Sequence, residues 1–282
     1  MQLLVMLLYA LGMLVVATGI TFVLTLAGVD TQSASGIRWT QAVTQLLTFL
    51  LPVVLMTLTY YRGSQREFYA LDFAGRKWVL ALAAVVMFLL LMPVIDWLTV
   101  WNDIWHWQGA WAALEEQLRS LGEMSSGIVE RLLNDGSVGG LVANLVVVAL
   151  IPAVCEEVFF RAGVQNLLQR WVRNPHVAVW IAAAIFSLAH GEVFAFLPRF
   201  LMGAVLGYLY IYSRSILVNS AVHFFNNAFV VVAYWLSARG IIDFDPEAPL
   251  AVDGTLTACC TLAAAGILYA SFIMPSKKGT VE

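Results

Sequence analysis

Charged residues are scarce in this chain. Only 12% of its 282 residues are Asp, Glu, Lys or Arg, whereas 61% are hydrophobic; ordinary soluble domains carry about 25% charged residues. So few charges could not cover the surface of a soluble globule, so the composition favours a membrane protein. The formal net charge of -3 and the lack of a basic stripe argue against a nucleic-acid partner.

Cysteine is also rare, and familiar metal patterns are missing. Cys155, Cys259 and Cys260 form neither a disulfide framework nor a CxxC pair, and the HExxH zinc motif is absent. The N-terminus has no charged stretch ahead of its apolar run, which exceeds the roughly 7 to 15 residues of a signal-peptide core. We therefore expect a retained first helix.

Apolar runs long enough to cross a bilayer, roughly 17 to 25 residues each, recur along the whole chain. They predict an all-α, multi-pass transmembrane bundle that forms a single domain over 1–282. The part at about 139–237 holds the polar residues discussed below. The predicted helices lie near 3–28, 40–61, 78–100, 139–169, 176–191, 197–213, 216–237 and 255–274.

The positive charges predict the orientation of this bundle. We expect the protein to lie in the inner or plasma membrane. Cytoplasmic segments of membrane proteins carry an excess of Lys and Arg, which predicts that both termini are cytoplasmic. The inner segments then carry Arg62, Arg66, Arg76, Lys77, Arg170, Arg173, Arg214, Lys277 and Lys278, against Arg38, Arg119, Arg131, Arg199 and Arg239 outside.

The longest outer segment, 101–137, begins with a series of tryptophans. Trp97, Trp101 and Trp105 recur every four residues and so share one helix face. Tryptophan is enriched at membrane interfaces. We interpret the stripe as an anchor in the lipid headgroups, with substrate docking as the alternative.

Several ionisable or amide side chains stand inside apolar runs, where a charge costs roughly 2.5 to 3.5 kcal/mol even on a lenient scale. The default interpretation of such residues is functional. They form three clusters on the fourth, fifth and seventh predicted helices: Glu156, Glu157 and Arg161; His190; and His223 with Asn226 and Asn227.

Helix geometry separates the two glutamates. Glu157 and Arg161 are four residues apart in the order that favours an ion pair, so charge compensation largely accounts for Glu157. Glu156 points about 100° away and has no partner on its own helix, so it must face other groups, the two histidines among them. Pro152 lacks an N–H and predicts a kink just before this site.

The other two clusters can be read in the same way. His223 and Asn227 are one turn apart on one face, while Asn226 flanks His223, and periodicity does not choose between the two asparagines. His190 shares a face with Phe186, which can pack beside the imidazole. A free Glu, two His and an Asn are the groups needed to activate a water and stabilise an oxyanion.

These residues carry a family resemblance. Glu156, Glu157 and Arg161 as EExxxR, Phe186 and His190 as FxxxH, and His223 and Asn227 as HxxxN resemble the motifs of the CPBP intramembrane protease family. That family includes type II CAAX prenyl endopeptidases and bacteriocin-processing or self-immunity proteins. The three motifs occur in the expected order on successive helices, and the resemblance favours Asn227 over Asn226.

The resemblance implies an intramembrane endopeptidase that uses a glutamate-activated water and needs neither metal nor other cofactor. Glu156 would be the general base, assisted by His190, with His223 and Asn227 stabilising the oxyanion. Glu157, Arg161 and Phe186 would support them. The implied partners are the lipid bilayer and a membrane-associated or lipidated protein or peptide substrate.

Other interpretations remain open at the level of sequence. Buried His and Asn residues can be interhelical hydrogen-bonding groups without chemistry, and two Glu with two His could bind zinc. Cys155 could act as a nucleophile, although a cysteine in a packed helix is commonly inert. The cluster could also serve binding or proton movement in a non-enzymatic scaffold, immunity protein or transporter.

Overall fold

The computed structural model describes residues 1–73, 75, 77–243 and 253–273, and every regular element within them is helical. Seven helical stretches are long and apolar enough to span a membrane: Gln2–Leu26, Ala34–Tyr60, Lys77–Asp103, Val138–Val172, Val193–Ser213, Ile216–Ala238 and Gly254–Ser271. Together with the shorter apolar helix Pro175–Ala189, they confirm the predicted multi-pass helical bundle.

The positions of the helices agree with the eight predicted runs, but their lengths differ. The fourth run is one helical stretch from Val138 to Val172, which extends beyond the predicted 139–169 at both ends. The fifth, α10 (Pro175–Ala189), is 15 residues long, short of the roughly 20 residues of a typical span. Residue 274 and the predicted inner charges Arg76, Lys277 and Lys278 lie outside the described residues.

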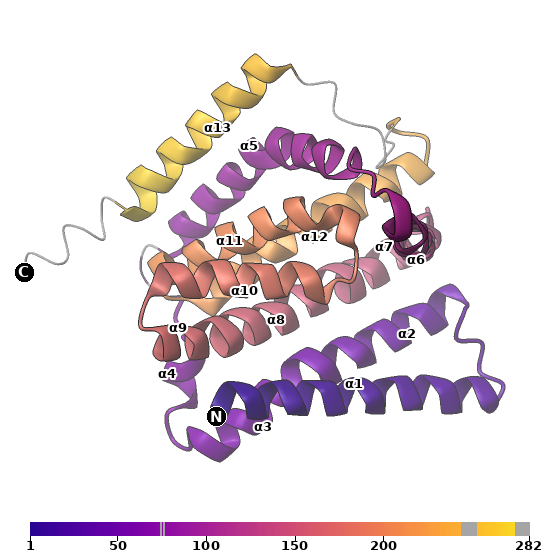
Figure 1. Ribbon diagram of the computed structural model, residues 1–282, viewed down its shortest axis with the longest axis horizontal. Helices are drawn as coiled ribbons and strands as arrows, with labels where there is room; N and C mark the ends of the chain where they lie inside the picture. The colour runs from indigo at the N-terminus through magenta and orange to yellow at the C-terminus, as the bar shows by residue number, and fades with distance from the viewer. Residues whose placement is uncertain (74, 76, 244–252, 274–282) are drawn as a thin grey trace, which may run out of the picture.

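The helices form layers that are visible in Figure 1. At one edge α1 (Gln2–Leu26) packs on η1 (Leu46–Leu50) and α3 (Leu51–Tyr60), which continue from α2 (Ala34–Gln45). At the opposite edge α13 (Gly254–Leu268), which η6 (Tyr269–Ile273) extends, packs along α5 (Lys77–Asp103). Between these edges lie α8 (Ile151–Glu157), α10, α11 (Phe196–Ser213) and α12 (Ile216–Ala238), the elements that carry the motifs or flank them.

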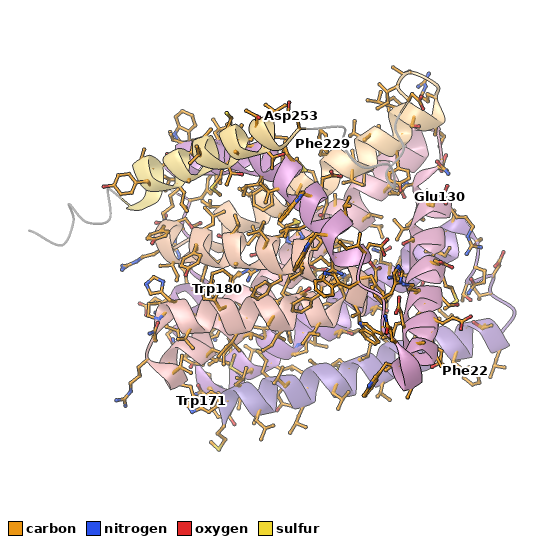
Figure 2. All side chains as sticks on the ribbon, turned by 45° about the horizontal axis from the view of Figure 1, so that its top comes forward. Phe22, Glu130, Trp171, Trp180, Phe229 and Asp253 are labelled. Atoms are coloured by element: carbon orange, nitrogen blue, oxygen red, sulfur yellow. The ribbon has the colours of Figure 1, made fainter. Side chains whose placement is uncertain are left out.

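The exterior of the bundle is apolar, as a lipid-facing surface requires. Large side chains such as Phe22, Trp180 and Phe229 project outward and are exposed, as Figure 2 shows. In a soluble protein such a surface would drive aggregation. In a bilayer it faces hydrocarbon of the same polarity, so the chain is a multi-pass membrane protein.

The helix carrying the glutamates is not regular throughout. It is built from α7 (Val138–Asn144), η3 (Leu145–Leu150), α8, η4 (Val158–Gln165) and α9 (Asn166–Val172), in which η3 and η4 are turns of π-helix. The Ile151 N–H bonds to the carbonyl of Val146, five residues back, and Pro152 follows at once. The distortion predicted at Pro152 thus takes the form of a π turn, a feature that is frequent at functional sites.

Segment 101–137, which we call the outer segment after its predicted side of the membrane, contains the end of α5, the short η2 (Gly109–Trp111) and α6 (Ala112–Leu133). The predicted tryptophan face holds for Trp97 and Trp101, which stack on α5 at a centroid distance of 6.4 Å. Because α5 ends at Asp103, Trp105 lies beyond the helix, where its ring meets Trp101 edge to face at 5.5 Å. α6 runs across the ends of the long helices (Figure 2). Lys77, Arg170 and Arg214 lie at the opposite ends of their helices from this segment, and the orientation of the bundle stays a prediction.

Candidate active site

Glu157 and Arg161 form the ion pair that their spacing predicts. The Arg161 Nε lies 3.0 Å from Glu157 Oε2, and both side chains are fully buried. The Cζ atom of Arg161 lies 5.4 Å from the ring centroid of Phe186. Because a buried charge requires a partner, this pair explains how one carboxylate and one guanidinium exist inside the bundle.

Glu157 has more partners than the sequence indicates. Its Oε1 lies 3.0 Å from His223 Nδ1, and its Oε2 accepts a hydrogen bond of 3.1 Å from Asn219 Nδ2. Asn219 also donates to the carbonyl of Leu206 at 2.7 Å, which ties α12 to α11. The prediction that charge compensation largely accounts for Glu157 is therefore incomplete, because this carboxylate also fixes the ring of His223.

Glu156 faces the two histidines, as its position on the helix suggests. Its Oε2 lies 3.9 Å from the Nε2 of His190 and 3.9 Å from the Nε2 of His223. These separations exceed the range of a direct hydrogen bond and suit a water molecule between the groups. The residue is 6% exposed, so the carboxylate is nearly enclosed by protein.

His190 stands just after α10, where it caps the helix. Its Nδ1 is 2.8 Å from the carbonyl oxygen of Phe186, so the Nδ1–H donates there. The Phe186 ring packs against the imidazole at a centroid distance of 4.7 Å, as predicted. In the neutral ring the other nitrogen is then an acceptor, and it is this Nε2 that faces Glu156.

Asn227 has no recorded side-chain contact with Glu156, His190 or His223 among the described residues. It is half-buried on α12, one turn beyond His223, and its Oδ1 accepts a hydrogen bond of 3.2 Å from Asn226 Nδ2. The structure thus places Glu156 between His190 and His223, and it joins His223 to Glu157. The recorded side-chain contact of Asn227 is to Asn226. A choice between the two asparagines still rests on the family resemblance.

Two residues of the cluster were missed by sequence reasoning. Gln45, at the end of α2, donates from Nε2 to Glu156 Oε1 at 3.0 Å, and Asn219 contacts Glu157 as described above. Both are amides inside apolar runs, so a search for every polar side chain within the membrane helices would have found them. Of the polar residues, only the ionisable ones, Asn226 and Asn227 were predicted from the sequence.

The structure bears on zinc and on Cys155 as alternatives to Glu156. Within residues 1–73, 75, 77–243 and 253–273, no group of three or more His, Cys, Asp or Glu side chains is arranged to hold a metal ion. Cys155 is buried next to Glu156 in the chain. Neither observation decides the reaction.

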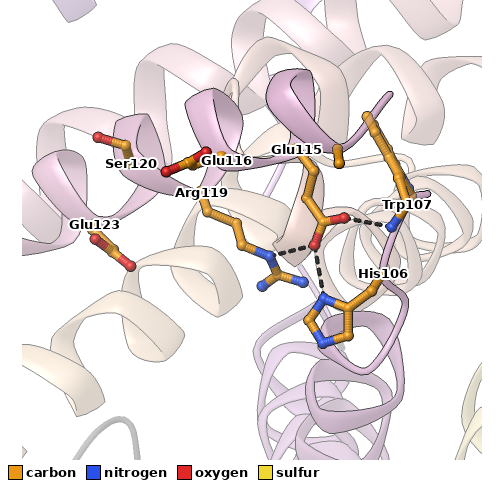
Figure 3. Close-up of a pocket in the computed structure, with 8 residues that line it drawn as sticks. His106, Trp107, Glu115, Glu116, Arg119, Ser120 and Glu123 are labelled. Atoms are coloured by element: carbon orange, nitrogen blue, oxygen red, sulfur yellow. Dashed lines mark hydrogen bonds and ion pairs between the residues drawn. The ribbon is translucent and has the colours of Figure 1, made fainter. Parts of the chain in front are cut away.

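Figure 3 shows a network around Glu115 in the outer segment. Glu115 accepts hydrogen bonds from the Trp107 N–H, Arg119 Nε and His106 Nδ1, in a cleft of about 540 Å³. These contacts, the Trp107 N–H first, lower the pKa of the Glu115 carboxyl to about 2. The Cζ of Arg119 lies 3.8 Å from the ring centroid of Phe194, so the network holds the loop between His190 and α11.

The end of α5 contacts the same loop. Asn102 Nδ2 donates to the carbonyl of Val193 at 3.3 Å, and its Oδ1 accepts from the N–H of Leu197 at 3.2 Å. The position of His190 therefore depends on the outer segment as well as on its own helix.

No curated protein and no solved structure matches the chain. Residues 138–229 match the family model described as "Type II CAAX prenyl endopeptidase Rce1-like". This segment is less than half of the chain but holds all three motifs. The match agrees with the resemblance that the motifs carry, and over residues 138–229 the chain is similar to the Rce1-like type II CAAX prenyl endopeptidases.

Proposed function

We propose that the protein is an intramembrane endopeptidase that hydrolyses a peptide bond with a water activated by Glu156. One observation carries the proposal: the Glu156 Oε2 faces the Nε2 atoms of His190 and His223 at 3.9 Å each. An enclosed carboxylate between two imidazoles, spaced for a water, is suited to general base catalysis.

In the proposed reaction, Glu156 takes a proton from the water as the oxygen attacks the carbonyl carbon of the scissile bond. The unprotonated Nε2 of His190 accepts the second hydrogen of that water as a hydrogen bond and so orients it. When the C–N bond breaks, the proton held by Glu156 passes to the leaving amine. The products are a carboxylic acid and an amine, without a covalent intermediate.

His223 and Asn227 would stabilise the negative oxygen of the tetrahedral intermediate. Because the Nδ1–H of His223 donates to Glu157, its Nε2 carries a hydrogen only when the ring is protonated on both nitrogens. The oxyanion role thus requires the imidazolium form, and the Glu157 carboxylate is placed to balance its charge. Such donors act most strongly where water is excluded.

The substrate class follows from the family description and from the apolar surroundings of the site. We propose a membrane-associated protein or peptide, with lipidated proteins included, cleaved in the inner or plasma membrane. The proposed mechanism uses side chains of this chain alone. The same polar cluster would also suit a scaffold, an immunity protein or a transporter, which would not need the basicity of Glu156.

The test compares the termini of membrane proteins in cells that express the wild type or Glu156→Gln at equal levels. We expect a small set of new termini that depends on Glu156, and these termini name the substrate. Purified Glu156→Gln should be folded and should not cleave a peptide that spans such a site. If the wild type and Glu156→Gln give equal sets of termini and the same cellular phenotype, the scaffold is favoured. Normal cleavage by purified Glu156→Gln would refute the role of Glu156.

A further inference from the structure

Gln45 approaches the site from a part of the chain that lies outside the matched segment. It is the last residue of α2, directly before the π turn η1. η1 is held against the glutamate-bearing helix by the Phe49 ring, which packs at 5.3 Å from Phe159 and 5.7 Å from Phe160 between centroids. These contacts bring Gln45 to Glu156, and its Nε2 lies 3.0 Å from the Glu156 Oε1.

The direction of this hydrogen bond follows from the chemistry of the two groups. An ionised carboxylate can only accept hydrogen bonds, so the amide nitrogen of Gln45 must face Glu156. The Oε1 of Gln45 is buried and has no hydrogen-bond partner among the described residues. Glu156 is thus the one recorded polar partner of an amide that is costly to keep inside an apolar helix.

The hydrogen bond distinguishes the two oxygens of Glu156. Oε1 is occupied by the amide of Gln45, whereas Oε2 faces both histidines. The terminal torsion of a glutamate has a broad, roughly two-fold energy profile, so an unrestrained carboxylate samples many rotations. An amide donor on one oxygen restricts this rotation and presents the other oxygen to the water.

We infer that Gln45 is a positioning residue, which orients the Glu156 carboxylate so that Oε2 points to the space between His190 and His223. This inference rests on the proposed function of Glu156 and extends it to the N-terminal helices. The bundle would then contribute to the reaction through a residue that no motif contains.

The experiment uses Gln45→Met, which keeps the length of the side chain and removes the donor. Steady-state cleavage is measured on a peptide that spans a site found by comparing membrane-protein termini, with rates normalised to folded protein. We expect kcat to fall about 10- to 100-fold, the usual cost of a hydrogen bond to a charged group. KM should stay within about two-fold, because an orienting role affects the chemical step. Gln41→Met, one turn earlier on α2 and without a recorded side-chain hydrogen bond, is the matched control.

A second readout does not require turnover. The infrared difference spectrum between the wild type and Glu156→Gln, with glutamate labelled by carbon-13, isolates the carboxylate band of Glu156. Gln45→Met should shift this band, and Gln41→Met should not. Gln45→Glu, which has the shape of glutamine but lacks the amide donor, should lose at least as much activity as Gln45→Met.

The outcomes separate the inference from the function on which it rests. Unchanged kcat and an unchanged carboxylate band in Gln45→Met would overturn the inference, as would a fall in melting temperature with normal kcat, which indicates a packing role. If Glu156→Gln cleaves normally, the proposed function fails instead. If Glu156→Gln is inactive and Gln45→Met is normal, only the role of Gln45 is lost.

Discussion

The Nδ1 of His223 lies 3.0 Å from the Oε1 of Glu157, although the two residues come from different helices. The other oxygen of the same carboxylate pairs with Arg161. One buried group therefore compensates a guanidinium and holds an imidazole, and these two tasks can be separated by mutation.

Glu157→Gln and Arg161→Leu should both destabilise the protein but differ in activity. Each strands a buried partner, which costs roughly 3 to 5 kcal/mol, so both should lower the melting temperature in detergent. Glu157→Gln also weakens the restraint on His223, so its single-turnover rate per folded molecule should be lower than that of Arg161→Leu. Equal rates for the two variants would mean that the contact between Glu157 and His223 does not matter for turnover.

His223→Ala and Asn227→Ala should lower kcat about 100- to 1000-fold, which is typical for removing one oxyanion donor. Asn226→Ala is the matched control on the neighbouring position and should be nearly normal. Steady-state kinetics on a cleavable peptide checks this, with circular dichroism to verify folding. If Asn226→Ala is the inactive variant, the assignment from the HxxxN motif is wrong and Asn226 is the residue that stabilises the oxyanion.

Cleavage should persist after removal of metals. The proposed reaction uses protein side chains for every proton transfer, so purified protein dialysed against strong chelators should keep its kcat. The measurement is cleavage before and after dialysis, followed by addition of zinc. Loss of activity that zinc restores would establish the metalloprotease interpretation.

The segment 101–137 should face the outside of the cell. Ser126, which is exposed on α6, is replaced by Cys in a variant whose Cys155, Cys259 and Cys260 are changed to Ser. An impermeant thiol reagent should label intact cells once any outer membrane is made permeable, because the positive charges predict that both termini lie inside. Labelling that requires full lysis would reverse the orientation.

Acidification should loosen the outer segment. The Trp107 N–H, Arg119 and His106 hold the pKa of Glu115 at about 2, below its usual 4.5. A carboxyl with a lowered pKa in the folded state stabilises the structure above its unfolded pKa, and this contribution disappears as the pH falls through the folded value. The hydrogen-exchange protection of 103–119, measured relative to the intrinsic exchange rate at each pH, should therefore fall between pH 4.5 and 2. Glu115→Gln should exchange rapidly already at pH 6, whereas Glu116→Gln, on the exposed side, should behave as the wild type.

The features predictable from sequence are those that act within one helix. The ion pair of Glu157 and Arg161 and the packing of Phe186 on His190 follow from residues four apart, whose proximity does not depend on the rest of the fold. The contacts of Glu157 with His223 and of Gln45 with Glu156 join residues on different helices. Their formation depends on how α2, α8 and α12 pack, which periodicity does not specify. Likewise, hydropathy located every span but did not reveal the π turns, because these change the hydrogen bonding of the backbone without changing its polarity.

The π turn ahead of Glu156 gives this helix a place to take up one residue without turning the site. A π turn holds one residue more than the α-helical turn it replaces, so the helix on either side keeps nearly the phase of an uninterrupted α-helix that is one residue shorter. Removing one residue from 145–150, with a return to α-helical bonding, would therefore leave Glu156 facing nearly the same way relative to Ser137 and the start of α7. When relatives of this chain are aligned, a one-residue gap in this turn is thus compatible with an unchanged orientation of the glutamate.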